Sequence, residues 1–297
     1  MTAGSRGVLV SIGSAVCFAA LYFATPMLAP LGAETVWAVR ILVTLPFVSA
    51  VLVATRGWSL VASLGARIAG RPALLLGVAA SGILLALQLW LFGWAPLNGR
   101  GLPVALGYFL LPLVLVLVGR FLYGERMRWW QWTAAGIAAV GVGFEIVRVG
   151  GVGWETLLVA LGYPVYFVLR RSLGFGHLGG MWWEIAVAVP VAAALLVVEI
   201  GWGSAFAAHP ALWWSAPAFG LFAAFALLLY LMASRLLPLS LFGLLSYVEP
   251  ALLVVASVLI GERIAAAELP AYLAIWAAVG VLLTGGIVEL VRSRRRR

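Results

Sequence analysis

Long apolar runs recur from one end of the chain to the other, and they limit the folds that it can adopt. A run of about 20 apolar residues is long enough to cross the hydrocarbon core of a bilayer as a helix. A helix satisfies its own backbone hydrogen bonds, so it can cross lipid where irregular chain cannot. Because the runs are separated by short connections, the sequence predicts an all-α polytopic membrane protein.

Composition supports this prediction and weakens the competing classes. The chain is 65% hydrophobic and only 10% charged, with a mean hydropathy of +1.12. A soluble domain has to present a far more polar exterior than these residues provide. All 19 basic residues are arginine and all 10 acidic residues are glutamate. With so few charges, the pI near 10.6 is better explained by membrane topology than by nucleic-acid binding, and we expect no nucleic-acid partner.

Hydropathy and the positions of the loop residues predict ten transmembrane helices. The stretch 55–72 has three arginines among apolar residues, and we expect it to connect two spans, with an amphipathic turn along the membrane interface. The predicted spans are 7–28, 35–54, 73–94, 102–121, 128–147, 152–171, 181–200, 211–234, 239–260 and 268–290.

The distribution of arginine predicts the orientation of the ten spans. With both termini in the cytoplasm, fifteen arginines fall on the inner side and three on the outer side, and Arg40 lies inside a span. Such a bias is the positive-inside rule of multi-pass membrane proteins. We therefore expect both termini to be cytoplasmic, with the basic run 294–297 facing anionic headgroups.

A sequence pattern occurs twice and indicates an internal duplication. A proline is followed by an apolar run and Gly-Glu-Arg, at Pro112 with 124–126 and again at Pro250 with 261–263. The prolines are 138 residues apart (250 − 112) and the Gly-Glu-Arg motifs 137 (261 − 124). Five spans per copy is an odd number, so the second copy enters the membrane upside down. We predict two inverted five-helix repeats, 1–148 and 149–297, with a site near the midplane between them.

Glu249 is the most informative polar residue, because it lies near the middle of the predicted span 239–260. A carboxylate at the centre of a span costs about 2.5–3.5 kcal/mol on insertion scales, so it should face protein or water. It could contact substrate or carry a proton. It could equally satisfy backbone groups that Pro250 leaves unpaired. The first repeat has Leu111 at the corresponding position.

Two further charged residues lie within spans but nearer to their ends. Arg40 is expected near the outer face and Glu184 near the inner face, so they should not pair with each other. They could close the two mouths of a pathway, or they could snorkel or form local ion pairs. We group them with Pro112 and Pro250 as gating or structural residues.

Aromatic and amide side chains recur at similar depths in several spans, which suggests a partly polar cavity lined by rings. For any single tyrosine, packing in the core explains the position as well as binding does. The predicted substrate-binding residues are Tyr22, Gln88, Trp90, Tyr108, Tyr163, Tyr166, Tyr247 and Glu249.

The motifs resemble those of a known family. The run 106–109, Pro112, the Gly-Glu-Arg motif at 124–126 and the pair Gln131-Trp132 are similar to the chloramphenicol-sensitivity (RarD) group of EamA-type drug/metabolite transporters. Gln88 stands where that group is expected to have asparagine. The resemblance implies ten helices in two inverted halves, export of small metabolites from the bacterial cytoplasm, and a multi-pass location in the inner membrane. Relatives in the superfamily include exporters of amino acids, aromatic ones among them.

We therefore expect a secondary transporter that exports small amphipathic metabolites by alternating access, with amino acids, including aromatic ones, as the favoured substrates. The alternatives are a proton-antiport exporter of drugs or other metabolites, and a membrane sensor or scaffold without transport activity. An enzyme is disfavoured, because the two histidines, His177 and His209, lie in predicted loops and no nucleophile motif or metal-ligand cluster occurs. We expect no catalytic residue, cofactor or metal. Small-residue stripes in the fifth and tenth spans are compatible with a monomer or a homodimer.

Overall fold

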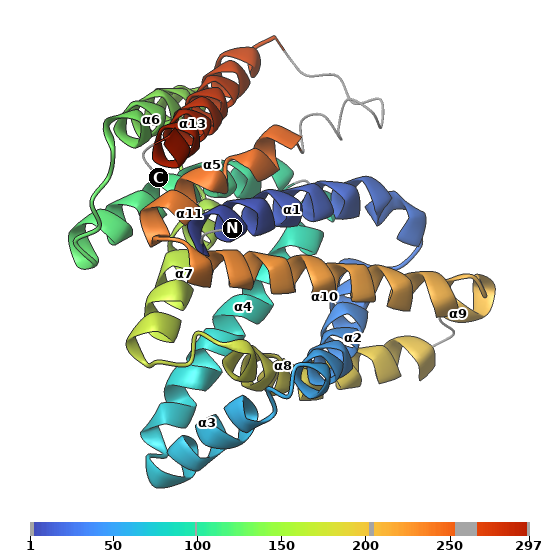
Figure 1. The fold of residues 1–297 in the computed structure, drawn as a ribbon. Helices are drawn as coiled ribbons and strands as arrows, with labels where there is room; N and C mark the ends of the chain where they lie inside the picture. Colours follow the sequence, from blue (N-terminus) through green and yellow to red (C-terminus); the bar gives the residue numbers. More distant parts are fainter. Residues whose placement is uncertain (1–2, 99, 202–204, 253–265, 296–297) are drawn as a thin grey trace. The chain divides into compact units, whose positions relative to one another are not determined.

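The computed structural model describes residues 3–98, 100–201, 205–252 and 266–295, and within these ranges it contains helices and turns but no strand (Figure 1). Seven of the described helices are long and apolar enough to cross a membrane, and three shorter ones are also apolar. The all-helical, multi-pass class is thus confirmed. The count of ten spans, the inverted repeat and the cytoplasmic termini stay predictions.

The helices follow the predicted spans closely at most ends. A 3-10 turn over Thr25–Leu28 follows the first helix, and a π-helical turn over Val118–Leu122 extends the fifth. In chain order the helices are α1 (Ala3–Ala24), α2 (Ala33–Ala54), α3 (Ser59–Gly70), α4 (Ala73–Leu97), α5 (Gly101–Leu117), α6 (Trp129–Val149), α7 (Trp154–Ser172), α8 (Leu178–Gly201), α9 (Ala205–Ala208), α10 (Leu212–Leu236), α11 (Leu239–Leu245) and α13 (Leu269–Arg295).

The chain forms two compact units, and each takes residues from both halves of the sequence. Unit 1 comprises Met1–Phe23, Leu102–Leu161 and Leu229–Arg297, and unit 2 comprises Ala24–Gly101 and Gly162–Leu228. The predicted repeats are a different division of the chain, with one boundary at 148. The units therefore describe packing, and the repeat boundaries remain a prediction from the sequence.

The core of unit 1 is built where α5, α6, α11 and α13 pack on one another. Helices α6 and α13 lie against each other along their lengths (Figure 1). A glycine makes this close approach possible, because a Cβ atom at Gly141 would lie 2.6 Å from the Cβ of Ala274. Small residues let apolar helices approach closely, and in lipid this packing replaces the hydrophobic effect as a source of stability.

The core of unit 2 is built around α8, which packs against α2, α3 and α4. Two glycines again mark the closest contacts. A Cβ atom at Gly82 would lie 2.7 Å from the carbonyl oxygen of Glu184, and one at Gly179 would lie 2.5 Å from the carbonyl carbon of Leu60. The backbones of α4 and α3 therefore touch α8 directly, which brings the side chains of these helices into one cluster.

Helix α3 occupies the stretch that we expected to be a connection with an amphipathic turn. It is a helix of 12 residues, with Val61 and Leu64 buried. Ile68 packs on the same side, in a cluster with Leu64 and Phe175. The positions 61, 64 and 68 are three and four residues apart, which is the spacing of one helical face. The apolar face of α3 therefore packs on the protein while its one arginine, Arg67, stays exposed.

Candidate functional site

The first candidate region begins at the N-terminus of α11, which a carboxylate from the other half of the sequence caps. The two Glu125 carboxylate oxygens accept the backbone N–H groups of Leu239 and Ser240, both at 2.8 Å. The Ser240 hydroxyl also donates to Glu125, at 2.8 Å. The first N–H groups of a helix lack partners within it. A carboxylate at this end accepts their hydrogen bonds, and its negative charge interacts favourably with the positive end of the helix dipole. Glu125 thus fixes where α11 begins.

The local chain around Glu125 is shaped for this contact. Gly124 has φ +63°, the left-handed region that glycine adopts without steric cost. A Cβ atom at Gly119, in the π-helical turn, would lie 2.7 Å from both the Glu125 carboxylate and the Ser240 nitrogen. Further on, the Gln131 side chain accepts the backbone N–H of Arg128 at 2.7 Å and caps α6. These motif residues therefore carry structural roles at helix ends.

Helix α11 packs on α5 and then breaks. A Cβ atom at Gly243 would lie 2.9 Å from the Pro112 carbonyl oxygen and 2.6 Å from the Leu115 Cβ. The helix ends at Leu245, a turn covers 246–247, and residues 248–252 are helical again. The predicted span continued to 260, and its part beyond 252 lies outside the described residues. The turn precedes Pro250, which lacks the N–H that would bond to the carbonyl of Ser246.

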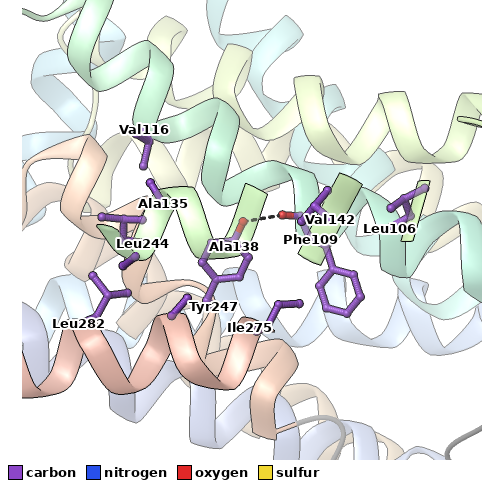
Figure 2. Close-up of a cluster of buried hydrophobic side chains, with 12 residues drawn as sticks. Leu106, Phe109, Val116, Ala135, Ala138, Val142, Leu244, Tyr247, Ile275 and Leu282 are labelled. Atoms are coloured by element: carbon purple, nitrogen blue, oxygen red, sulfur yellow. Dashed lines mark hydrogen bonds between the residues drawn. The ribbon is translucent and has the colours of Figure 1, made fainter. Parts of the chain in front are cut away.

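Tyr247 lies at this break and is fully buried in the core of unit 1. Its hydroxyl donates a hydrogen bond of 2.9 Å to the carbonyl oxygen of Phe109 in α5, as Figure 2 shows. A buried tyrosine needs a partner for its hydroxyl, and this bond supplies it. The hydrogen bond joins the turn after α11 to Phe109 of α5, which lies three residues before Pro112.

Glu249 follows the break by two residues, beside Pro250. Its backbone N–H bonds to the Ser246 carbonyl at 3.3 Å, an i to i+3 pattern, and the regular i to i+4 pattern resumes between Ala251 and Tyr247. Within the part of the chain that the structure describes, its carboxylate makes no hydrogen bond or ion pair. The side chain is partly buried.

The second candidate region is a buried polar network in unit 2, centred on Glu184 of α8. The Ser81 hydroxyl of α4 donates to one oxygen of Glu184. The Tyr166 hydroxyl of α7 donates to the other oxygen at 3.4 Å, and Arg170 forms an ion pair with it, also at 3.4 Å. Glu184 is 1% exposed and Arg170 6%.

Arg170, near the end of α7, connects the network to the residue that precedes α8. Its guanidinium donates to the Tyr166 hydroxyl at 2.5 Å and to the His177 carbonyl at 3.3 Å. The sequence placed Arg170 among the inner-side charges and did not suggest a buried partner for it. A buried ion pair requires hydrogen bonds to its remaining polar atoms, and Ser81 and Tyr166 provide them.

A third set of charges, on α6 and beside α13, was also missed by the sequence analysis. Arg148 binds both oxygens of Glu145, at 2.9 and 2.5 Å, and contacts Glu268 at 3.5 Å. Because Glu268 directly precedes α13, its contact with Arg148 joins the ends of two packed helices. Within the described ranges, no group of three or more histidine, cysteine or acidic side chains could hold a metal ion.

The other predicted site residues lie in both units. In unit 2, Gln88 and Arg40 are buried, and Tyr163 stacks on Phe167 with ring centres 6.4 Å apart. Trp90 stacks on Trp94 and donates to Glu34 at 3.4 Å. In unit 1, Tyr22 and Tyr108 are partly buried.

The structure brings together two subsets of the predicted residues. In unit 1, α11 and the residues after its break carry Tyr247, Glu249 and Pro250, and α11 packs against α5 at Pro112. In unit 2, Tyr166 and Glu184 share one hydrogen bond. Roles in substrate binding or gating remain proposals for all of them.

Comparison with known proteins gives relatives along the whole chain. No model of a known protein family matches it. The chain is 40% identical to the chloramphenicol-sensitive protein RarD of Pseudomonas aeruginosa, covering 100% of this chain and 99% of the relative. It is 35% identical to the uncharacterized transporter PM1281 of Pasteurella multocida, covering 97% and 98%. It is 30% identical to protein RarD of Streptomyces exfoliatus, covering 98% and 92%.

A solved crystal structure shares the fold, with a TM-score of 0.63 and 20% identity over 93% of this chain and 96% of that one. The apolar helices and the relatives named as transporters together define a multi-pass membrane transporter. Within that class, the chain belongs to the RarD family. The resemblance inferred from the motifs around Pro112 and Gln131 is thereby confirmed.

Proposed function

We propose that the protein is a secondary transporter of the bacterial inner membrane that exports small amphipathic metabolites from the cytoplasm by alternating access. Amino acids, including aromatic ones, are the substrate class that we favour. The proposal assigns no catalytic chemistry to the chain. Its membership of a transporter family gives the general activity, and the buried polar residues give the reasons for the finer assignment.

The contrast between two carboxylates carries the proposal. Glu184 is held by a serine, a tyrosine and an arginine, so its bonding capacity is used within unit 2. Glu249 lies beside a break in an apolar helix, and its carboxylate has no partner among the described residues. Polar groups in a bilayer are costly and usually belong to a substrate or ion pathway. We therefore assign to Glu249 the role of binding the amino group of a substrate or of carrying a proton.

The break itself supports a transport role. Interrupted helices that bring backbone groups and polar side chains to the midplane are a common feature of transporter binding sites. The hydrogen bond from Tyr247 to Phe109 joins positions 138 residues apart, the same offset that separates Pro250 from Pro112. A contact between equivalent positions is what a pseudo-two-fold axis near that point would produce. This observation favours the inverted repeat, an architecture that many alternating-access transporters share.

The test is counterflow of labelled amino acids by the purified protein in proteoliposomes. We expect uptake of aromatic and other neutral amino acids into vesicles that hold the same unlabelled compound. Glu249→Gln should lower this uptake at least tenfold, because the amide offers no negative charge to the substrate amine or proton. Glu268→Gln removes a carboxylate at the start of α13 and should keep transport near the level of the unsubstituted protein.

Other outcomes separate the alternatives. If the protein exchanges drugs or other metabolites for protons, no amino-acid counterflow should occur, and a pH gradient should stimulate uptake of those compounds. Glu249→Gln should then abolish the stimulation. A sensor or scaffold predicts no counterflow of any compound by protein that is folded in the vesicles. If Glu249→Gln and Glu268→Gln transport equally well, the role assigned to Glu249 is wrong.

A further inference from the structure

A pocket with a volume of about 600 Å³ opens in unit 2 where α3, α4 and α7 end or begin. Its lining comes from the last turn of α3, the first turn of α4 and the end of α7 with the residue after it. The lining residues are Arg67, Gly70, Arg71, Ala73, Leu74, Ser172 and Leu173. None of these residues is among those that we assign to the transport pathway.

The walls of the pocket are held in place by contacts around α3. The Trp183 ring nitrogen of α8 donates to the Val61 carbonyl of α3 at 3.1 Å. Beneath the pocket, Leu64, Val78 and Phe175 form a buried apolar cluster that Ile68 and Leu173 extend. Helix α3 is therefore packed firmly on the bundle, which holds this wall of the pocket in place.

The two arginines in the lining differ in how their donors are used. Arg67 donates to the carbonyl oxygens of Leu173 at 2.7 Å and Gly174 at 3.1 Å, which joins α3 to the chain that follows α7. A guanidinium has five N–H donors, so others remain available. Arg71 is exposed, and its side chain has no hydrogen bond or ion pair within the described part of the chain. The pocket therefore presents positive charge and donors to an anion.

The position of the pocket relative to the bilayer follows from α4. This helix is a candidate span from Ala73 to Ala95, so its first residue lies at one surface of the hydrocarbon core. The pocket is thus at headgroup depth. Immediately beyond it, Leu75 is 43% exposed and Leu76 is 73% exposed on α4. An amphipathic molecule could place its charged group in the pocket and its apolar chains along these leucines.

We propose that this pocket binds the phosphate headgroup of an anionic phospholipid. The arginines complement the phosphate, because guanidinium groups match phosphate geometry and are weakly hydrated. Basic pockets beside membrane-spanning helices are known to favour anionic headgroups. The exposed leucines distinguish a lipid from a free phosphate, since a soluble phosphate would gain nothing from them. The site gives the transporter a lipid requirement that is independent of its substrate.

The test measures lipid binding by the purified protein in detergent. The probes are dioleoyl-phosphatidylglycerol, dioleoyl-phosphatidylcholine and glycerol 3-phosphate, with bound lipid counted by native mass spectrometry and stability followed as Tm. We expect phosphatidylglycerol to bind and to raise Tm, while the zwitterionic lipid and the soluble phosphate do neither. Arg71→Gln should weaken the binding of phosphatidylglycerol about fivefold, the factor that about 1 kcal/mol per arginine near an anionic surface represents.

Matched variants control for general charge and for folding. Arg71→Lys keeps the charge and should retain most of the affinity. Arg126→Gln removes an exposed arginine of unit 1 outside the pocket and should bind phosphatidylglycerol like the unsubstituted protein. Equal losses in Arg71→Gln and Arg126→Gln would show that only net charge matters and would overturn the proposal. Equal effects of glycerol 3-phosphate and phosphatidylglycerol would show that the site is not a lipid site.

Discussion

Glu184 and Arg170 carry opposite charges in a part of unit 2 where both are almost completely buried. An isolated charge in such surroundings is far more costly than a paired one. Ser81 and Tyr166 bond to the same pair, so three helices meet at one polar cluster. The cluster gives α4, α7 and α8 a defined register within unit 2.

Removing one member of this pair should destabilise the protein strongly. Glu184→Gln leaves the Arg170 charge buried without its carboxylate, and breaking a buried pair in this way costs about 3–5 kcal/mol. The unfolding of the detergent-solubilised protein, followed as Tm, should show a large decrease. The double substitution Glu184→Gln with Arg170→Gln should lose less than the sum of the two single substitutions.

The control for that experiment lies on the same helix. Glu199 of α8 is a partly exposed carboxylate whose bonds to Thr35 and to the Ala205 N–H are both 3.4 Å long. Glu199→Gln should change stability little, since both bonds are longer than a typical hydrogen bond and the amide oxygen of glutamine can still accept one of them. A Tm for Glu184→Gln no lower than that for Glu199→Gln would contradict a structural role for the buried pair.

For single residues, the sequence could indicate which side chains lie inside a membrane span, but not which other residues they contact. Hydropathy placed Glu184 and Tyr166 inside spans, and the structure finds both buried. The interactions of Glu184 with Ser81 and of Glu125 with Ser240 join residues more than 100 positions apart in the chain. Periodicity describes which face of one helix is apolar, and it does not say which helix comes next to that face.

Helix α11 shows how a short element is fixed at both ends and in the middle. Glu125 caps its start, Gly243 allows contact with α5, and the hydrogen bond of Tyr247 holds the break that follows. Because α11 has only seven residues, its stability has to come from these contacts rather than from helix propensity. The residues before Glu249 are thus held firmly within unit 1.

Gly243→Ala should disturb this arrangement. The added Cβ would lie 2.6 Å from the Leu115 Cβ and 2.9 Å from the Pro112 carbonyl oxygen, and backbone atoms of α5 cannot move aside cheaply. Overpacking of this kind costs about 1–3 kcal/mol. We expect a lower Tm and faster amide hydrogen exchange in α11.

Gly136→Ala provides the comparison, because Gly136 lies in α6 and, apart from the backbone of its own helix turn, no atom lies within 4 Å of the added Cβ. Alanine at an open helical position lowers the entropy of the unfolded chain and stabilises by about 0.4–1 kcal/mol. Gly136→Ala should therefore melt at the same temperature as the original protein or higher. The proposed contact between α11 and α5 is refuted if the two variants have the same Tm.

The elements were more predictable than the contacts between them. Long apolar runs determine the spans, so the predicted range 35–54 differs from α2 at one end by only two residues. Helix α3 was missed because hydropathy averaged over a long window cannot detect a 12-residue helix with one apolar face. The break after Leu245 could be anticipated from Pro250, whereas its exact start depends on the contacts of Tyr247.

At the scale of the whole molecule, the positions of the arginines in unit 2 predict how the protein is oriented in the membrane. The hydrogen bonds of Arg67 to Leu173 and Gly174 show that two arginine-bearing connections, one after α2 and one after α7, lie at the same end of the unit. Under the positive-inside rule, that end should face the cytoplasm. Helix α4 begins at this end with Ala73 and finishes at Leu97, so Asn98 should be on the opposite side of the membrane.

Labelling of single cysteines tests this orientation directly. The chain has one cysteine, Cys17, within α1, so Cys17→Ala provides a background without thiols. Ser63→Cys in α3 and Ser172→Cys at the end of α7 are exposed, and so is Asn98→Cys after α4. A membrane-impermeant maleimide should label Ser63→Cys and Ser172→Cys only in inverted vesicles, and Asn98→Cys only in intact spheroplasts. Labelling of Ser63→Cys and Ser172→Cys from opposite sides would contradict the structure of unit 2, because both side chains lie at its arginine-bearing end. Labelling of both from the periplasm would leave the unit intact and reverse the predicted orientation.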